Sequence, residues 1–205
     1  RAGDLAERSE RGIAILIVRD ETSKDFTHKQ YSDLSAAQAD ESLYTADNYA
    51  AICDMMALHL SAHIFRVDAS GALADTLAAI GKTVKTGWIA VAGQNAADGA
   101  ALAAWVKAQD NTRKKTYKAV CYNLATAPDD MHVVNYVNES VTYTDDRGTQ
   151  DGVTYLPSLL AIFAVCNVTR GCTNYECSNL SEVVEVDDND AALGTGKFIL
   201  LQRRG

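Results

Sequence analysis

The chain has 205 residues, 47% of them hydrophobic, which is enough for one large α/β domain or a domain with a small appendage. Its formal net charge of −8 argues against a general nucleic-acid binder, because phosphate binding requires a basic face that displaces counterions. No apolar run reaches the roughly 18 to 20 residues that a membrane-spanning helix needs, so no membrane partner is expected.

In the first two thirds of the chain, apolar β-branched runs alternate with segments that carry apolar residues at three- and four-residue steps. The expected elements in chain order are a buried strand at residues 13–18, a polar segment with short elements at most over residues 19–47, a helix from Asp47 or Asn48 to about Ala62, a strand at 64–67, a helix at 72–82, a strand at 88–91, a helix capped by Asn95, and strands at 117–121 and 132–136. This order predicts βαβ crossovers and a largely parallel sheet flanked by helices.

The remainder of the chain predicts a small additional α+β part. Its expected elements are two strands around a turn at Asp145–Gly148, a helix at residues 155–168, a half-buried strand at 182–186, a short helix or turn at 191–196 and a strand at 197–201. The predicted fold class is therefore α/β, with a mixed, largely parallel sheet. Two subdomains are possible, residues 1–138 and residues 139–205.

An α/β sheet raises the expectation of an enzyme, but the motifs of common active sites are missing. The segment 93–99 follows a strand and opens a helix, yet it has neither the GxGxxG spacing nor the Lys-Ser/Thr of a phosphate-binding loop, which favours a tight turn with a helix cap. His59 and His63 are four residues apart, but the position that a zinc protease gives to its catalytic Glu holds Leu60.

Cysteine and aspartate patterns point to no bound ion either. The spacing of Cys166, Cys172 and Cys177 is not that of a zinc knuckle, and the five cysteines of the chain fit reduced thiols. None of the aspartate runs follows the spacing of a calcium loop. We therefore predict no catalytic residue, no cofactor and no metal site.

Six stretches resemble, in order, one known family. They are ERGI at residues 10–13, FRVD at 65–68, the block WIAVAG, LAAWVK and RKKTYKAV within 88–120, VVNYVN at 133–138, the segment 155–186, and AALGTGKFIL at 191–200. Together they are similar to the tail sheath proteins of contractile phages, in particular those of phages and defective prophages of Gram-positive bacteria.

This resemblance implies a structural subunit that polymerises as hexameric rings into a helical sheath around a tail tube, and that contracts to drive the tube into a host cell envelope. Implied partners are other copies of the chain, the tail tube protein and the baseplate, and no cofactor. The implied location is the virion tail, assembled in the cytoplasm of the bacterial host.

In that family, terminal extensions add strands to the sheets of neighbouring subunits. Compared with that family, the amino-terminal arm and the carboxy-terminal extension are expected to be truncated here, so the chain alone is expected to be a soluble monomer. Residues next to the missing arms are the predicted contacts between subunits: Arg11, Gly12, Ile13, Phe198, Ile199 and Leu200.

Two other classes of protein compete with this interpretation. One is an α/β enzyme, either a hydrolase or a nucleotide-binding protein, which would have a pocket with convergent polar groups at the carboxyl ends of the parallel strands. The other is a module that binds a small ligand or a partner and has no role in assembly.

Overall fold

A computed structural model describes residues 12–58, 60–113, 115–166 and 171–202. The helices are α2 (Leu34–Ala39), α3 (Ala46–Met56), α4 (Leu73–Thr83), α5 (Ala96–Arg113), α6 (Leu156–Ala164) and α7 (Asn189–Gly194), with short 3-10 turns η1 (Glu41–Leu43) and η2 (Gly152–Tyr155). The strands are β1 (Gly12–Arg19), β2 (His28–Tyr31), β3 (Leu60–Val67), β4 (Gly87–Val91), β5 (Tyr117–Tyr122), β6 (Val133–Tyr136), β7 (Ser140–Tyr143), β8 (Thr149–Asp151), β9 (Leu180–Val183) and β10 (Lys197–Phe198).

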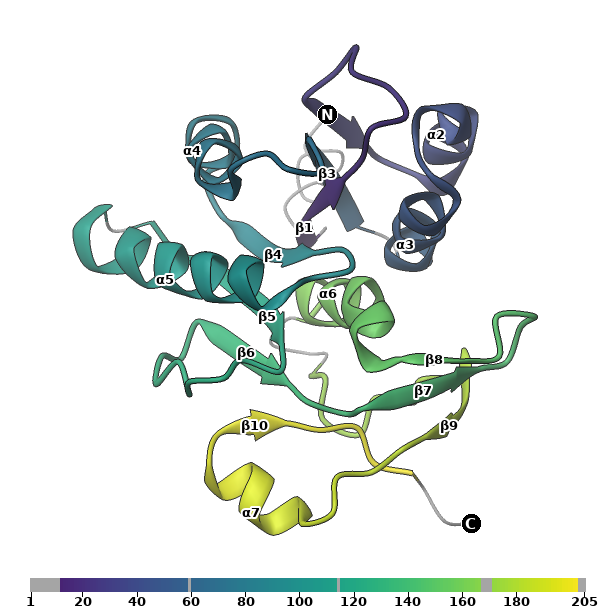
Figure 1. Cartoon of the computed structure of the whole chain (residues 1–205), viewed down its shortest axis with the longest axis vertical. Helices are drawn as coiled ribbons and strands as arrows, with labels where there is room; N and C mark the ends of the chain where they lie inside the picture. Colours follow the sequence, from purple (N-terminus) through teal and green to yellow (C-terminus); the bar gives the residue numbers. More distant parts are fainter. Residues whose placement is uncertain (1–11, 59, 114, 167–170, 203–205) are drawn as a thin grey trace, which may run out of the picture.

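Two sheets organise these elements (Figure 1). The larger has seven strands in the order β10-β6-β5-β4-β1-β3-β2, and every neighbouring pair is parallel except β2 with β3. The smaller is antiparallel, with the order β8-β7-β9. The predicted class is confirmed: an α/β fold with a mixed, largely parallel sheet and a small additional carboxy-terminal part. Within the described residues, no helix is both long and apolar enough to cross a membrane.

Helices cover both faces of the larger sheet, and β1 shows why its sequence is continuously apolar. Ile15 and Ile17 point to the face packed by α4 and α5, whereas Leu16 and Val18 point to the face packed by α3 and α6. All four side chains are fully buried. A strand with side chains on alternating faces must be apolar at every position when both faces are covered.

Helix α6 lies between the two sheets (Figure 1), and all nine of its residues are buried. Its sequence LPSLLAIFA is apolar on all sides, as expected of a helix that has no solvent-facing side. Phe163 stacks on Trp88 of β4 with ring centres 4.9 Å apart and meets Phe198 of β10 edge-on at 5.2 Å. The helix therefore joins the carboxy-terminal part to the larger sheet through one continuous core.

The helix predicted up to Ala62 is wrong in its second half. Its cap is Thr45, whose hydroxyl accepts a hydrogen bond from the Asn48 amide, and α3 ends at Met56. Leu60 already belongs to β3, which pairs with β1 along eight residues. Long-range pairing with β1 thus overrides the helical spacing of the local sequence.

The predicted carboxy-terminal elements exist but have different bounds. The strand expected at residues 182–186 lies at Leu180–Val183, and the one expected at 197–201 comprises only Lys197 and Phe198. The second strand ends early because the side chain of Asn138, and no neighbouring strand, bonds the main chain of Leu200. The helix expected at 155–168 is divided into η2 and α6, and the end of that expected range lies outside the described residues.

The close approach of Gly152 to the link between β6 and β7 gives a test of this packing. A Cβ atom at Gly152 would collide with the carbonyl oxygen of Asn138. We expect Gly152→Ala to lower the free energy of unfolding by about 2 to 3 kcal/mol, measured by chemical denaturation. Gly194→Ala is the control, because a Cβ there meets open space and should change stability by less than about 0.5 kcal/mol. Equal effects of the two substitutions would contradict the packing.

Candidate functional site

The carboxyl ends of β1, β3 and β4 form the region where α/β sheets commonly bind ligands. Here Arg19, the last residue of β1, occupies it. Its guanidinium donates to both carboxylate oxygens of Asp98 in α5, at 2.9 and 2.7 Å. It also donates to the carbonyl oxygens of residues 68, 69 and 71, each at 3.0 Å. The cation is therefore committed to contacts within the chain.

Asp20 fills the adjacent position and is only 1% exposed. Its carboxylate accepts hydrogen bonds from the amides of Thr22 and Thr45 and from the side chain of Asn48. Burial raises the pKa of this carboxyl, but the hydrogen bonds from Asn48, Thr45 and Thr22 outweigh that effect and lower its pKa to about 2. Arg19 and Asp20 thus form a closed polar network where an enzyme would present free groups to a substrate.

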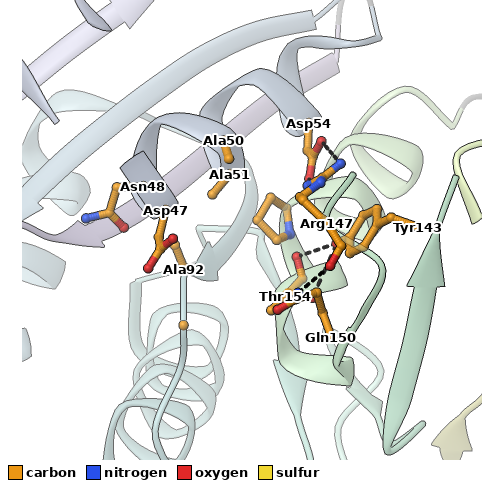
Figure 2. Close-up of a pocket in the computed structure, with 12 residues that line it drawn as sticks. Asp47, Asn48, Ala50, Ala51, Asp54, Ala92, Tyr143, Arg147, Gln150 and Thr154 are labelled. Carbon is orange, nitrogen blue, oxygen red and sulfur yellow. Dashed lines mark hydrogen bonds and ion pairs between the residues drawn. The ribbon is translucent and has the colours of Figure 1, made fainter. Parts of the chain in front are cut away.

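A cavity of about 320 Å³ lies beside this network, between α3, the turn after β4 and the hairpin β7–β8 (Figure 2). It is lined by Asp47, Asn48, Ala50, Ala51, Asp54, Ala92, Gly93, Tyr143, Arg147, Gln150, Thr154 and Pro157. These residues include no Ser, Cys, His or Lys, the side chains that most often act as a nucleophile or its base. The lining therefore lacks a serine or cysteine nucleophile with a histidine or lysine base.

Arg147 dominates one wall of the cavity and ties the β7–β8 hairpin to α3 (Figure 2). It forms ion pairs with Asp54 at 2.6 Å and with Asp145 at 2.7 Å. Its guanidinium carbon lies 3.7 Å from the centre of the Tyr143 ring. A planar cation held by two carboxylates and an aromatic face is a positioning contact, because each of its three nitrogens already donates to a carboxylate.

The other sequence candidates have structural roles in the described residues. Gly93 has a φ of 57°, and Asn95 accepts the amide of Asp98, which confirms the tight turn and helix cap. All five cysteines lie within the described residues, and none of them is in a disulfide. His59 lies outside the described residues, and His63 is in a strand, not at a helix end. No cluster of three or more metal-ligating side chains occurs within the part of the chain that was described.

The predicted contact residues at the carboxy-terminal end lie along the edge of the larger sheet. Phe198 is in β10, and its carbonyl oxygen accepts a hydrogen bond from the Val137 amide at 3.2 Å. Ile199 is buried, and Leu200 donates its amide to Asn138 at 2.7 Å. Within the described ranges, β10 has β6 on one side and no strand on the other.

The predicted contact residues at the amino-terminal end lie elsewhere. Gly12 and Ile13 begin β1, in the middle of the sheet, where they pair with Leu60 and Ser61 of β3. From Ala14 onward, β4 covers the other side of the strand. Three strands separate β1 from β10, so the structure does not bring the two sets together. Arg11 lies outside the described residues, and a role of this set between subunits stays a prediction.

Asn138 is a residue that the sequence did not single out for this site. It is fully buried, and its side chain donates to the carbonyl oxygens of Val184 and Leu200, each at 2.9 Å, while it accepts the Leu200 amide. The side chain of Asn138, which follows β6, thus connects two other segments: the one at the end of β9 and the one after β10. Its only sequence signal is its place at the end of the motif VVNYVN.

Removing this amide should release the sheet edge. We expect Asn138→Ala to lower the free energy of unfolding by about 2 kcal/mol, because main-chain groups of Leu200 and Val184 lose their partner. Hydrogen exchange of residues 198–202 should accelerate as well. Asn111→Ala, on the exposed side of α5, is the control and should stay within about 0.5 kcal/mol of the parent. Unchanged exchange at residues 198–202 would disprove the assigned role.

A double-mutant cycle tests the contact of Arg147 with α3. The side chains of Arg147 and Asp54 are 31% and 14% exposed, so solvent screens the pair only in part. We expect a coupling free energy of about 1 kcal/mol between Arg147→Ala and Asp54→Ala. The exposed pair Lys24–Glu21 is the control and should show no measurable coupling. If both cycles gave the same coupling, Arg147 would not fix the hairpin.

Comparison with known proteins found matches among solved structures only. No family model and no curated protein sequence matches the chain. Among solved structures, it is similar to the sheath tail protein of Desulfitobacterium hafniense, with a TM-score of 0.73, 14% identity, and coverage of 92% of this chain and 68% of that one.

Two further structures are similar over nearly the whole chain. A sheath tail protein of Listeria innocua gives a TM-score of 0.72 at 12% identity, over 96% of this chain and 67% of that one. The helical sheath of the anti-feeding prophage in its contracted state gives 0.69 at 12% identity, over 92% of this chain and 57% of that one. The chain thus spans between 57% and 68% of the length of these proteins, and its fold is that of tail sheath proteins.

Proposed function

We propose that this chain is a structural subunit of a contractile tail sheath, and that it has no catalytic role. The observation that carries the proposal is the likeness of fold to three sheath proteins, which extends over at least 92% of the chain. Self-association is supported by the neighbour whose structure is a helical sheath. The closed network of Arg19 and Asp20 favours this role over the enzyme alternative, because it commits both charged groups at the usual ligand position to contacts within the chain.

Strand addition at β10 is the physical basis that we propose for contacts between copies. In a parallel ladder, successive residues direct their main-chain groups to opposite sides of the strand. Because Phe198 bonds β6, the main-chain groups of Lys197 and Ile199 face the open edge. A strand from a neighbouring copy could bond them without requiring a particular side chain.

The remaining parts of the proposal follow from the sheath role. Copies of the chain would stack as rings around a tail tube in the virion tail, with the tube protein and the baseplate as partners, after assembly in the host cytoplasm. Contraction would exchange one set of packed contacts between subunits for another. Residues 1–138 would supply most of the larger sheet, and residues 139–205 the small sheet, α6 and the edge strand β10.

Electron microscopy of the protein, expressed with whatever sequence flanks residues 1–205 in its gene, tests the proposal. We expect rings or tubes in the parent protein. Lys197→Pro should reduce them severalfold, because proline removes an N–H that faces the open edge of β10. Lys197→Ala is the matched control and should assemble like the parent.

Two outcomes would count against these ideas, and they are separable. A parent protein that stays monodisperse at every concentration and salt tested would contradict the sheath role itself. Tubes of equal length and number from Lys197→Pro, with unchanged circular dichroism, would contradict strand addition at β10 while leaving the sheath role intact.

A further inference from the structure

The opposite edge of the larger sheet is covered by β2, the four-residue strand that runs antiparallel to β3. A pair of histidines connects the two strands: Nε2 of His28 in β2 lies 3.0 Å from Nδ1 of His63 in β3. Both side chains are half-buried. Short edge strands are held by few main-chain hydrogen bonds, so a side-chain bond of this kind adds to the attachment.

The two imidazole rings face each other edge to edge. Their planes differ by only 7°, and their centres are 5.3 Å apart. This separation equals the 3.0 Å between the two nitrogens plus about one ring radius for each imidazole, so the two nitrogens lie on the line between the ring centres. The ring of Phe65 stacks on His28 at 4.4 Å and fixes its orientation. An in-plane contact between two nitrogens has room for one proton, which one ring donates and the other accepts.

Within the described residues, no anion is placed to neutralise a second proton. Among the described residues, no carboxylate makes a hydrogen bond or ion pair with either ring. On the same two strands, Lys29 pairs with Asp40, and Arg66 pairs with Asp68. The charged residues of α4, the helix that packs on this face of β3, are Asp75 and Lys82, and both are exposed.

We propose that the pair His28–His63 is an acid-sensitive latch, which holds β2 on the sheet while it shares one proton and releases β2 when both rings are protonated. Two N–H groups that point at each other across 3.0 Å repel, and the burial that favours the neutral rings makes the doubly charged pair costly. Release of β2 would uncover the edge of β3, an eight-residue strand and hence a new surface for strand addition.

The expected pH range follows from the two titrations. Burial lowers the pKa of both histidines, and burial together with the charge of His28 lowers the pKa of His63 to about 4. An unfolded histidine has a pKa of about 6.5, so the latch contributes fully above that pH. Its contribution declines as the pH falls from about 6.5 toward about 4, because the released strand binds more protons than the attached one.

The carboxylate on the other face of β2, that of Asp40, is fixed by two hydrogen bonds. Asp40 binds Lys29 at 2.7 Å and accepts the hydroxyl of Tyr31 at 2.8 Å. Burial raises the pKa of Asp40, but these two hydrogen bonds outweigh it and keep the pKa below its usual value of 3.8. A loss of hydrogen-exchange protection in β2 between pH 6.5 and 4.5 would therefore report on the protonation of the two histidines.

Hydrogen exchange of residues 28–31 as a function of pH tests the latch. After correction for the intrinsic rate, we expect protection in the parent to fall between pH 6.5 and 4.5, by up to about tenfold per pH unit for each proton bound. His28→Phe keeps an aromatic ring against Phe65 but leaves His63 as the only ring of the pair that can bind a proton. Protection of residues 28–31 in this variant should therefore fall less steeply with pH than in the parent. His132→Gln is the control: its imidazole bonds Asp130, away from β2, so the parent's pH dependence should persist.

Titration of the ring signals by NMR gives a readout that does not depend on the variants. We expect His28 and His63 to titrate below the range of an ordinary histidine, together with the loss of protection in β2. Protection that is constant from pH 7.5 to 4.5 in the parent would overturn the proposal. So would the same pH dependence in parent and His28→Phe, or ring signals that titrate near pH 6.5 while β2 stays protected.

Discussion

The burial of α6 is the constraint on which the rest of the fold depends. A helix that is apolar on every side cannot remain at the surface of a sheet, so something must cover its outer side. The larger sheet and α3 cover part of it, and the small sheet with the segment around β10 covers the rest. Because α6 needs all of these contacts, the carboxy-terminal part cannot separate from the larger sheet without exposing a row of leucine and phenylalanine side chains.

Sequence-based prediction succeeded where the signal was local. The helices α4 and α5, the cap at Asn95 and the turn at Asp145–Gly148 all follow from residues within one or two turns of chain. It failed where a partner far along the chain decided the outcome. The residues before Leu60 continue a helical spacing, and only pairing with β1 makes the following segment a strand. The early end of β10 likewise depends on Asn138, about sixty residues earlier in the chain.

The candidate site shows the same division between local and distant signals. The sequence excluded a phosphate-binding loop and a zinc-protease motif because both are short, contiguous patterns. It could not reveal the closed network at the carboxyl ends of the strands, since Arg19 finds Asp98 across 79 positions and the carbonyl of residue 71 across 52. The sequence also contains no sign that His28 and His63 are in contact, because their contact depends on the register of β2 against β3. Such groups become recognisable only when the strand order is known.

The two edges of the larger sheet differ in a way that bears on assembly. At one edge β10 is short and has no strand beside it among the described residues, whereas at the other edge β2 covers β3 and is itself held on both faces. A subunit with two open edges could join copies at either end and aggregate. Here β2 also has no strand on its outer side within the described residues. A strand that a neighbour adds at β10 from another part of its chain makes a head-to-tail contact, and such contacts produce rings and helical arrays. Under the proposed function, the contact at β10 is therefore made with a different part of the neighbouring copy, and not with its β10.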